Sequence, residues 1–367
     1  MVDSQTPGSV SAQAMDSTPA TAGAQAAVAA QEAPVTQPAT TPAIAGAQAA
    51  TAPPPPPPPS PGRKAGFAEL SYYARWFFAS KFLGRRNPLQ SVLFITDRCN
   101  LRCAHCNVVK EGPEVTTMTY GQVREQLQYC YDLGSRIIDF EGGEPLLWRD
   151  DQAGADLNTL VDLARAMGFF SLTVTTNAQL PITANSDLVW ISLDGLEQAH
   201  DEQRGSGSFA RAFKNIDACE HPNLNVNMVV TNRNYRDFEP LATLVKEHPK
   251  LKRLSFSFYV PYESRGLLPT AAMRNEVIDQ ALRLKKAGYP LMNSTAGLKL
   301  LRDPQNFLHK RQCWISNFIS SDGTRSPACP GERAGICDDC GFGMAPEMSL
   351  LFSFHPSMIK AGLTVRA

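Results

Sequence analysis

The alternation of apolar and polar residues divides the chain into an unpatterned tail and a patterned remainder that begins near residue 91. In the remainder, short apolar runs alternate with stretches whose apolar residues recur at helical spacing. The runs predict strands at residues 92–96, 136–141, 172–176, 189–193, 225–230 and 254–259. The stretches predict helices at residues 120–133, 157–167, 209–219 and 238–247. Strands that alternate with helices indicate an α/β fold with a parallel sheet.

One connection departs from this pattern. The third and fourth predicted strands are connected only by residues 178–188, and Pro181 interrupts this short connection. Proline lacks a backbone donor and clashes with the preceding helical turn. We therefore expect the third crossover helix to be shortened or missing.

The tail is dominated by Ala, Pro, Thr, Ser, Gln and Val, and it ends in the proline run 53–59. Such a segment cannot bury enough apolar surface to offset its ordering entropy, so disorder is predicted for residues 1–65. Polyproline favours an extended helix that docks into aromatic-lined grooves, which leaves a scaffold role open. The first basic residue is Arg63, so a secretory signal is not expected.

An aromatic-rich helix is predicted at residues 67–83, followed by Gly84 and the basic pair Arg85 and Arg86. A basic helix with Trp and Phe can lie on a membrane surface. Alternatively, the helix caps the end of the strands that follow. We favour the cap and keep a membrane surface as an alternative.

Charge and cysteine usage limit the function classes. The 35 Lys and Arg balance the 35 Asp and Glu, so no global field attracts nucleic acid and no nucleic-acid partner is expected. The nine cysteines form a group of three, a group of four and two isolated residues. This distribution is unlike the disulfide framework of a secreted protein. A cytoplasmic location and metal ligation are therefore predicted. Cys130 and Cys219 follow apolar residues at helical spacing and are expected to be buried fillers.

The group of three comprises Cys99, Cys103 and Cys106, directly after the first predicted strand. Three thiolates at C-x3-C-x2-C spacing can bind three irons of a 4Fe–4S cube and leave the fourth iron open. An open position distinguishes a catalytic metal site from a structural one. A zinc knuckle with a fourth ligand from elsewhere is the alternative.

With His105 before its last cysteine, this run resembles the cluster loop of the radical S-adenosylmethionine (radical SAM) superfamily. The turn Gly142-Gly143-Glu144-Pro145 resembles the superfamily's GGEP motif. Glycines at a strand end let a ligand approach the backbone closely. The resemblance implies that the backbone and the carboxylate of this turn hold the amino group of S-adenosylmethionine.

Two further strand ends resemble motifs of the same superfamily. Asn177 stands in a Thr-Asn-Ala turn, with Ala178 where glycine is common, and could bind ribose or substrate or simply form the turn. The fourth strand leads into a block that resembles the superfamily's SLDG…HD..R pattern. The resemblance implies that Ser192 and Arg204 bind the methionine carboxylate and that Asp194 binds the ribose hydroxyls. A guanidinium suits a carboxylate through paired, charge-assisted hydrogen bonds.

The group of four lies near the C-terminus and comprises Cys313, Cys329, Cys337 and Cys340. A β-hairpin turning at Asp322-Gly323 is predicted between the first two. The set resembles the short form of the SPASM auxiliary-cluster domain, called twitch, which implies a second 4Fe–4S cluster. Four cysteines also suit a zinc ribbon, and that alternative stays open.

The resemblance implies a partial (β/α)6 barrel over residues 91–308, preceded by the helix at 66–90 and followed by a Cys-rich auxiliary-cluster domain at 309–367. The active site is expected at the carboxyl ends of the strands. The implied reaction is reductive cleavage of S-adenosylmethionine to a 5′-deoxyadenosyl radical that abstracts hydrogen from a substrate, with a flavodoxin or ferredoxin as reductant. The substrate, a peptide or a small-molecule precursor, is not indicated by any residue. An iron–sulfur electron-transfer or sensor protein is the rival.

Overall fold

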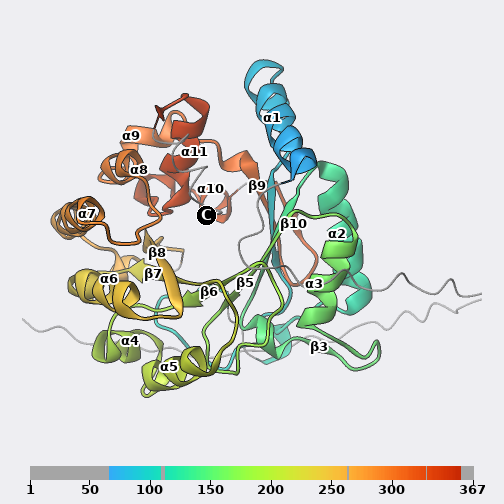
Figure 1. The fold of residues 1–367 in the computed structure, drawn as a ribbon, viewed down its shortest axis with the longest axis horizontal. Helices are drawn as coiled ribbons and strands as arrows, with labels where there is room; N and C mark the ends of the chain where they lie inside the picture. The colour runs from blue at the N-terminus through green and yellow to red at the C-terminus, as the bar shows by residue number, and fades with distance from the viewer. Residues whose placement is uncertain (1–65, 109–111, 263, 328, 357–367) are drawn as a thin grey trace, which may run out of the picture. The chain divides into compact units, whose positions relative to one another are not determined.

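A curved sheet of eight strands, in the order β10-β9-β1-β2-β5-β6-β7-β8, organises the protein (Figure 1). The computed structural model describes residues 66–108, 112–262, 264–327 and 329–356, so the predicted tail lies outside the described residues. The strands of the sheet are β1 (Gln90–Phe94), β2 (Ile137–Glu141), β5 (Ser171–Thr176), β6 (Leu188–Ser192), β7 (Leu224–Val230), β8 (Leu251–Phe258), β9 (Ser316–Ile319) and β10 (Arg325–Ser326). A separate two-stranded ribbon joins β3 (Arg149–Asp150) and β4 (Ala155–Asp156).

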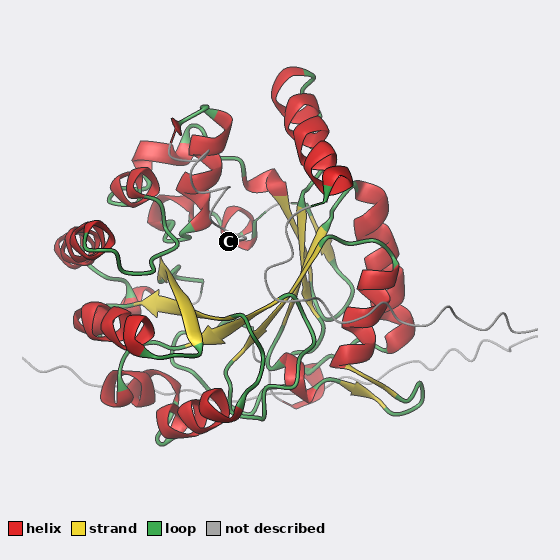
Figure 2. Ribbon diagram, in the orientation of Figure 1, coloured by secondary structure: helices red, strands yellow, loops and turns green. Residues whose placement is uncertain are grey.

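Helices α2 to α7 lie along the outer side of the curved sheet, and α1 and α8 to α11 lie elsewhere around it (Figure 2). Their bounds are α1 (Phe67–Phe82), α2 (Tyr120–Leu133), α3 (Leu157–Ala166), α4 (Glu197–Arg204), α5 (Ser208–Ala218), α6 (Phe238–Glu247), α7 (Ala271–Lys286), α8 (Thr295–Leu300), α9 (Gln305–Leu308), α10 (Pro330–Arg333) and α11 (Met344–Phe352). Six strands pair in parallel with their neighbours, in the order β1, β2, β5, β6, β7 and β8. This arrangement confirms the predicted α/β partial barrel. The chain crosses from β5 to β6 without a helix, as predicted.

The two faces of the sheet differ in polarity. On β2, Ile138 and Phe140 are fully buried in the main core, which includes residues of the outer helices. Side chains alternate along a strand, so Asp139 and Glu141 point to the inner face. Asp139 lies opposite Thr173 of β5, whose hydroxyl donates a hydrogen bond to the Asp139 carboxylate. The inner face of the barrel is therefore polar in this region.

The predicted C-terminal hairpin forms, with β9 and β10 antiparallel and Gly323 at a φ of 85° in its turn. The sequence did not predict where this hairpin lies in the fold. Strand β9 pairs in parallel with β1, so that Ser316 lies opposite Gln90 and the hairpin extends the barrel sheet. The proposed boundary at residue 309 thus separates parts that share one sheet.

The segment after β10 returns to the opposite edge of the sheet. The backbone N–H of Phe258, the last residue of β8, donates to the carbonyl of Gly341 at 2.8 Å. At the other edge, the N–H of Leu89, just before β1, donates to the carbonyl of Ile315 at 2.8 Å. Residues 313–341, which carry the four C-terminal cysteines, therefore connect the β9 side of the sheet with β8.

Helix α1 packs at the amino ends of β1 and β2. The indole N–H of Trp76 donates to the Asn87 carbonyl at 2.8 Å, and the Tyr72 hydroxyl donates to the carbonyl of Gly134. Trp76 also packs in a small core with Ile315 and Phe352. This contact agrees with the favoured interpretation of the helix as a cap. Within the described ranges, none of the helices combines the length and apolar character that a membrane span requires.

Candidate active site

The cysteine loop leaves the carboxyl end of β1 and carries Cys99, Cys103 and Cys106. Backbone N–H groups point at two of the sulfurs, from Leu101 to Cys99 at 3.4 Å and from Val108 to Cys106 at 3.5 Å. Burial raises the pKa of the Cys103 thiol to about 11, although Arg204 acts in the opposite direction. Such donors and a nearby cation favour thiolate sulfur, which is the form that binds metal.

The glycine pair after β2 is explained by this loop. The N–H of Gly143 donates to the Thr96 carbonyl at 2.7 Å, and the N–H of Glu144 donates to the Arg98 carbonyl at 2.8 Å. A Cβ atom at Gly142 would collide with the Thr96 carbonyl, and one at Gly143 with the Arg98 carbonyl. The sequence predicts that a ligand approaches these glycines. The structure shows that the backbone leading into Cys99 lies against both glycines.

Glu144 connects the turn after β2 with the turn after β5. The carboxylate is fully buried and accepts hydrogen bonds from the Thr176 hydroxyl at 2.7 Å and from the Asn177 N–H at 2.8 Å. Burial raises the pKa of Glu144, while these donors act against the shift. Asn177 in turn donates from Nδ2 to Cys99 Sγ at 3.5 Å. Ala178 adopts a φ of 56°, in the left-handed region that favours glycine.

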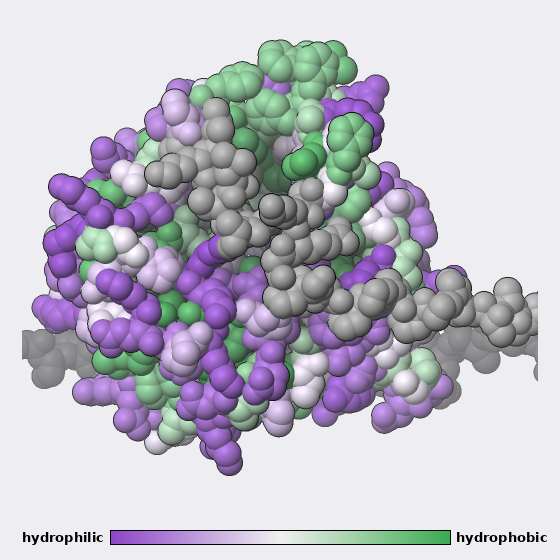
Figure 3. Space-filling view, in the orientation of Figure 1, coloured by the Kyte–Doolittle hydropathy of each residue, from purple (hydrophilic) through white to green (hydrophobic). Residues whose placement is uncertain are grey.

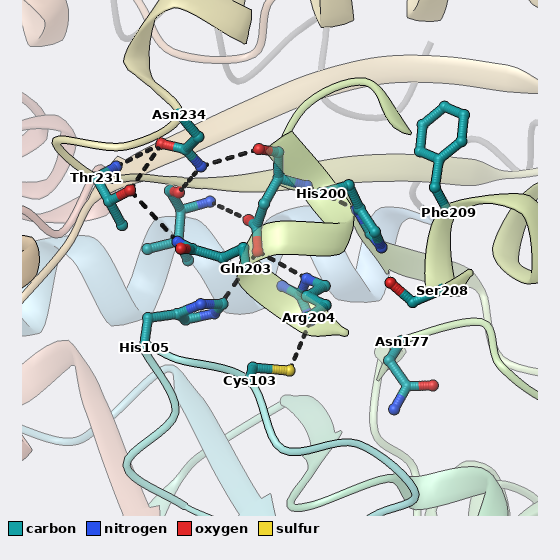
Figure 4. Close-up of polar contacts among 12 residues, drawn as sticks. Cys103, His105, Asn177, His200, Gln203, Arg204, Ser208, Phe209, Thr231 and Asn234 are labelled. Carbon is teal, nitrogen blue, oxygen red and sulfur yellow. Dashed lines mark hydrogen bonds and ion pairs between the residues drawn. The ribbon is translucent and has the colours of Figure 1, made fainter. Parts of the chain in front are cut away.

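A buried ion pair lies beside the second cysteine (Figure 4). Arg204 Nε donates to Asp194 Oδ2 at 2.7 Å, and Arg204 Nη1 points at Cys103 Sγ at 3.9 Å. The other Asp194 oxygen accepts from the Val229 N–H at 2.9 Å. Burial opposes ionisation of Asp194, but Arg204 and then His105 outweigh it and hold its pKa below the usual value.

These contacts bear on the roles that the resemblance implied. Asp194 is fully buried, and its two oxygens accept hydrogen bonds from Arg204 and Val229. Ser192, the last residue of β6, lies opposite Asn227 of β7 at the same end of the sheet. The structure thus gathers the predicted residues of the cysteine loop and the strand ends into one region.

The sequence did not predict three hydrogen bonds of this region. The Asn234 side chain donates to the backbone carbonyls of Asp194 at 2.9 Å and of Val229 at 2.8 Å. The N–H of Ala104, inside the cysteine loop, donates to the Gln203 carbonyl at 2.8 Å. The run of polar residues directly after β7 was the available signal for Asn234. Backbone contacts such as that of Ala104 leave no signal in side-chain identity.

His105 forms part of the wall of a pocket beside the cysteine loop. Its Nε2 lies 3.7 Å from Asp194 Oδ2, and its buried Nδ1 has no hydrogen-bond partner among the described residues. Burial lowers the pKa of His105 to about 4, against the attraction of Asp194, so the imidazole is neutral near pH 7. The pocket has a volume of about 230 Å³ and is lined by Ala104, His105, Cys106, Asn107, Arg233, Tyr259, Ser264, Gly266 and Leu267.

The four C-terminal cysteines lie close enough to influence one another. Burial, followed by the charges of Cys329 and Cys340, raises the pKa of Cys313 to about 12. A Cβ atom at Gly331 would lie 3.8 Å from both Cys329 Sγ and the Tyr262 hydroxyl. Across the described residues, no three His, Cys, Asp or Glu side chains converge as ligands of a single metal ion. In a four-iron cube each thiolate binds its own iron, so the donor chemistry of both cysteine sets fits such a cluster.

The comparison with known families agrees with this geometry. Residues 93–245, which begin within β1 and end within α6, match the family model of the radical SAM superfamily. The matched residues include the cysteine loop, the turn after β2 and the Asp194–Arg204 pair, so this part of the chain is similar to radical SAM domains.

Two curated relatives are synthases. Fe-coproporphyrin III synthase of Methanosarcina barkeri is 25% identical over 220 residues, which cover 53% of this chain and 52% of the relative. Pre-heme d1 synthase of Dinoroseobacter shibae is 30% identical over 175 residues, which cover 44% of this chain and 42% of the relative. The chain thus spans about half the length of these relatives.

The fold is also that of a solved structure. Streptococcus suis SuiB bound to S-adenosylmethionine superimposes with a TM-score of 0.51 at 21% identity, covering 72% of this chain and 66% of SuiB. At this identity the likeness concerns the fold alone.

Proposed function

We propose that the protein is a radical SAM enzyme in which Cys99, Cys103 and Cys106 hold a 4Fe–4S cluster with one open iron. The observation that carries the proposal is the Arg204 guanidinium, fixed by Asp194 and pointing at Cys103. When bound, the cluster supplies the electron that cleaves S-adenosylmethionine to methionine and a 5′-deoxyadenosyl radical. A pure electron carrier needs no buried cation at this place, which argues against the rival interpretation.

The methionine end of the cofactor is proposed to lie against Arg204 and Ser192. A carboxylate beside Arg204 gains charge-assisted hydrogen bonds, and Asp194 keeps the guanidinium oriented for them. The turn Gly142-Gly143-Glu144 is proposed to hold the amino group, mainly through its backbone, since the Glu144 carboxylate already accepts bonds from Thr176 and Asn177.

The adenosyl end is proposed to enter the pocket beside His105. A pocket of about 230 Å³ is smaller than the roughly 300–1,000 Å³ of whole-ligand sites, so it suits one part of a larger molecule. Because Nε2 faces Asp194, the proton of the neutral His105 belongs on Nε2 and Nδ1 is an acceptor. An exocyclic amine of a base would supply the donor that this buried nitrogen lacks.

The substrate is proposed to face the inner side of the barrel. Asp139, Glu141 and Thr173 make this face polar, which suits hydrogen-bonding groups on a peptide or a small-molecule precursor. Fe-coproporphyrin III synthase and pre-heme d1 synthase make a small-molecule substrate one candidate, and SuiB, also solved with its precursor peptide SuiA, makes a peptide another.

The C-terminal region is proposed to hold a second 4Fe–4S cluster on Cys313, Cys329, Cys337 and Cys340. Its support is a set of four mutually close thiols that belongs to a segment connecting β9 with β8. With four protein ligands, this cluster would serve as an electron conduit. A flavodoxin or ferredoxin would supply the electrons. A zinc ion on the same cysteines is the alternative.

Electron paramagnetic resonance of the anaerobically reconstituted and reduced protein tests the open iron. Adding S-adenosylmethionine should change the signal of the wild type and of Cys219→Ala, whose cysteine is buried away from both sets. In Cys103→Ala, the remaining signal of the C-terminal cluster should not respond. A wild-type signal that ignores S-adenosylmethionine would refute the proposed site.

A further inference from the structure

Helix α1 exposes an apolar stripe along its whole length. Phe67 is 89% exposed, and Leu70, Phe78 and Phe82 are each more than half exposed. Residues three, four or eight positions apart lie on the same face of a helix, and these four positions are spaced in this way. Figure 3 shows the corresponding hydrophobic surface over α1. Monomeric proteins rarely leave such a contiguous apolar patch without a partner.

The stripe cannot turn inward, because the opposite face of α1 is already packed. Trp76 is only 8% exposed, and its ring contacts Phe352 edge-on at 6.0 Å. Lys81 Nζ donates to the Phe352 carbonyl at 2.6 Å, which fixes the end of the helix to the C-terminal segment. Rotating α1 to hide Phe78 would expose Trp76. The packed face of α1 therefore acts as the cap, and the opposite face stays exposed. The two roles that the sequence offered as alternatives can thus belong to opposite faces of the same helix.

The charge around the stripe has one sign. Residues 63–86 hold six Lys and Arg and a single acidic residue, Glu69, although the whole chain is neutral. Glu69 is 3% exposed, whereas Arg75, Arg85 and Arg86 are exposed. Among the described residues 66–86, the charged side chains that are exposed beside the aromatic and aliphatic groups are therefore all cations. A symmetric contact with a second copy would bring like charges together, which disfavours a dimer through this face.

We propose that this face of α1 is a docking surface for an anionic phospholipid bilayer, with the helix lying in the plane of the interface. Apolar side chains enter the boundary between headgroups and acyl chains, and the arginines bind the anionic headgroups. The lipid-facing residues are Phe67, Leu70, Phe78, Phe82, Leu83 and Phe354. Because α1 packs at the amino ends of β1 and β2, docking leaves the cysteine loop at the carboxyl ends free.

Co-sedimentation of the full-length protein with lipid vesicles tests this surface. Vesicles of equal parts phosphatidylcholine and phosphatidylserine should pellet the protein, vesicles of phosphatidylcholine alone should pellet less, and added salt should reduce the difference. The variant Leu70→Gln/Phe78→Gln/Phe82→Gln should lower the bound fraction by about tenfold or more, because affinity scales with buried apolar area. Arg85→Gln/Arg86→Gln should weaken only the binding to anionic vesicles.

The control variant is Phe342→Gln/Met344→Gln, which removes two exposed apolar residues outside α1 and should pellet like the wild type. Thermal melts of all variants check that the fold is retained. Wild-type protein that stays in the supernatant overturns the proposal. Equal pelleting of the triple variant also overturns it. A dimer in sedimentation velocity that the triple variant abolishes, without vesicle binding, would show that a second copy covers the face.

Discussion

Arg204 Nε lies 2.7 Å from Asp194 Oδ2, and this buried pair places a cation beside Cys103. Removing one partner of a buried pair leaves the other charge uncompensated. The pair therefore makes two separable contributions: Asp194 compensates and orients the guanidinium, and the guanidinium is available to a carboxylate. Substitutions at Arg204 can separate the two.

Arg204→Lys should weaken the binding of S-adenosylmethionine by about 1.5–3 kcal/mol, the value of a hydrogen bond to a charged group, because lysine lacks the second donor arm. Arg204→Ala should lose the same binding and also about 3–5 kcal/mol of stability, since Asp194 is left unpaired. Isothermal titration calorimetry measures the first effect and urea unfolding the second.

The matched control is Arg211→Ala, which removes an exposed guanidinium hydrogen-bonded to Gln179 and should leave binding and iron content unchanged. If Arg204→Ala and Arg204→Lys both bound S-adenosylmethionine as the wild type does, Arg204 would have no role at the carboxylate.

Gly143→Ala should disrupt the cysteine loop without touching any cysteine. The new Cβ would collide with the Arg98 carbonyl, one residue before Cys99, and force the loop away from the turn. We expect the reconstituted variant to lose about four irons, the content of one cube. Gly121→Ala, in α2 where a Cβ meets only ordinary contacts, should retain the full iron content. Full iron in Gly143→Ala would mean that the loop tolerates the displacement.

Stability should depend on pH through Glu141. Burial, and then the charge of Asp139, raises the pKa of Glu141 from 4.5 to about 8. The folded protein therefore keeps a proton that the unfolded chain releases, so the free energy of unfolding falls as the pH rises through this interval. Glu141→Gln should flatten the dependence between pH 5 and pH 8, whereas Glu276→Gln at an exposed site should not. An equal slope in Glu141→Gln and the wild type would contradict this account.

The sequence predicted the six barrel strands and the missing third crossover helix because each depends on local patterning and on proline. It did not predict that β9 joins the sheet beside β1, since strand pairing across more than two hundred residues leaves no trace in local periodicity. For the same reason, the sequence did not predict that the backbone of Thr96 and Arg98 lies so close to Gly142 and Gly143 that a side chain there would collide with it.

The candidate site shows the same limit at the level of side chains. The residue types and spacing indicated Cys103, Asp194 and Arg204, but not that Asp194 would be buried beneath the guanidinium. Helix α1 was also ambiguous from its sequence, because Trp76 and Phe78 are both apolar and only packing shows which of them is buried.

The second cluster is tested by metal analysis. Reconstituted wild type should contain about eight irons per chain, and a variant with alanine at Cys313, Cys329, Cys337 and Cys340 should contain about four. If the wild type instead holds about four irons and one zinc, the C-terminal cysteines form a structural clip. Because this segment connects β9 with β8, the quadruple variant should also exchange amide hydrogens faster at Leu89 and Phe258.

The formation of 5′-deoxyadenosine tests the central claim most directly. Wild-type protein, reconstituted anaerobically and given a strong reductant, should convert S-adenosylmethionine to 5′-deoxyadenosine and methionine, and Cys219→Ala should do the same. Cys103→Ala should form neither product while retaining the iron of the C-terminal set. Continued product formation by Cys103→Ala, or none by the fully loaded wild type, would contradict the assignment of the three-cysteine loop as the catalytic site.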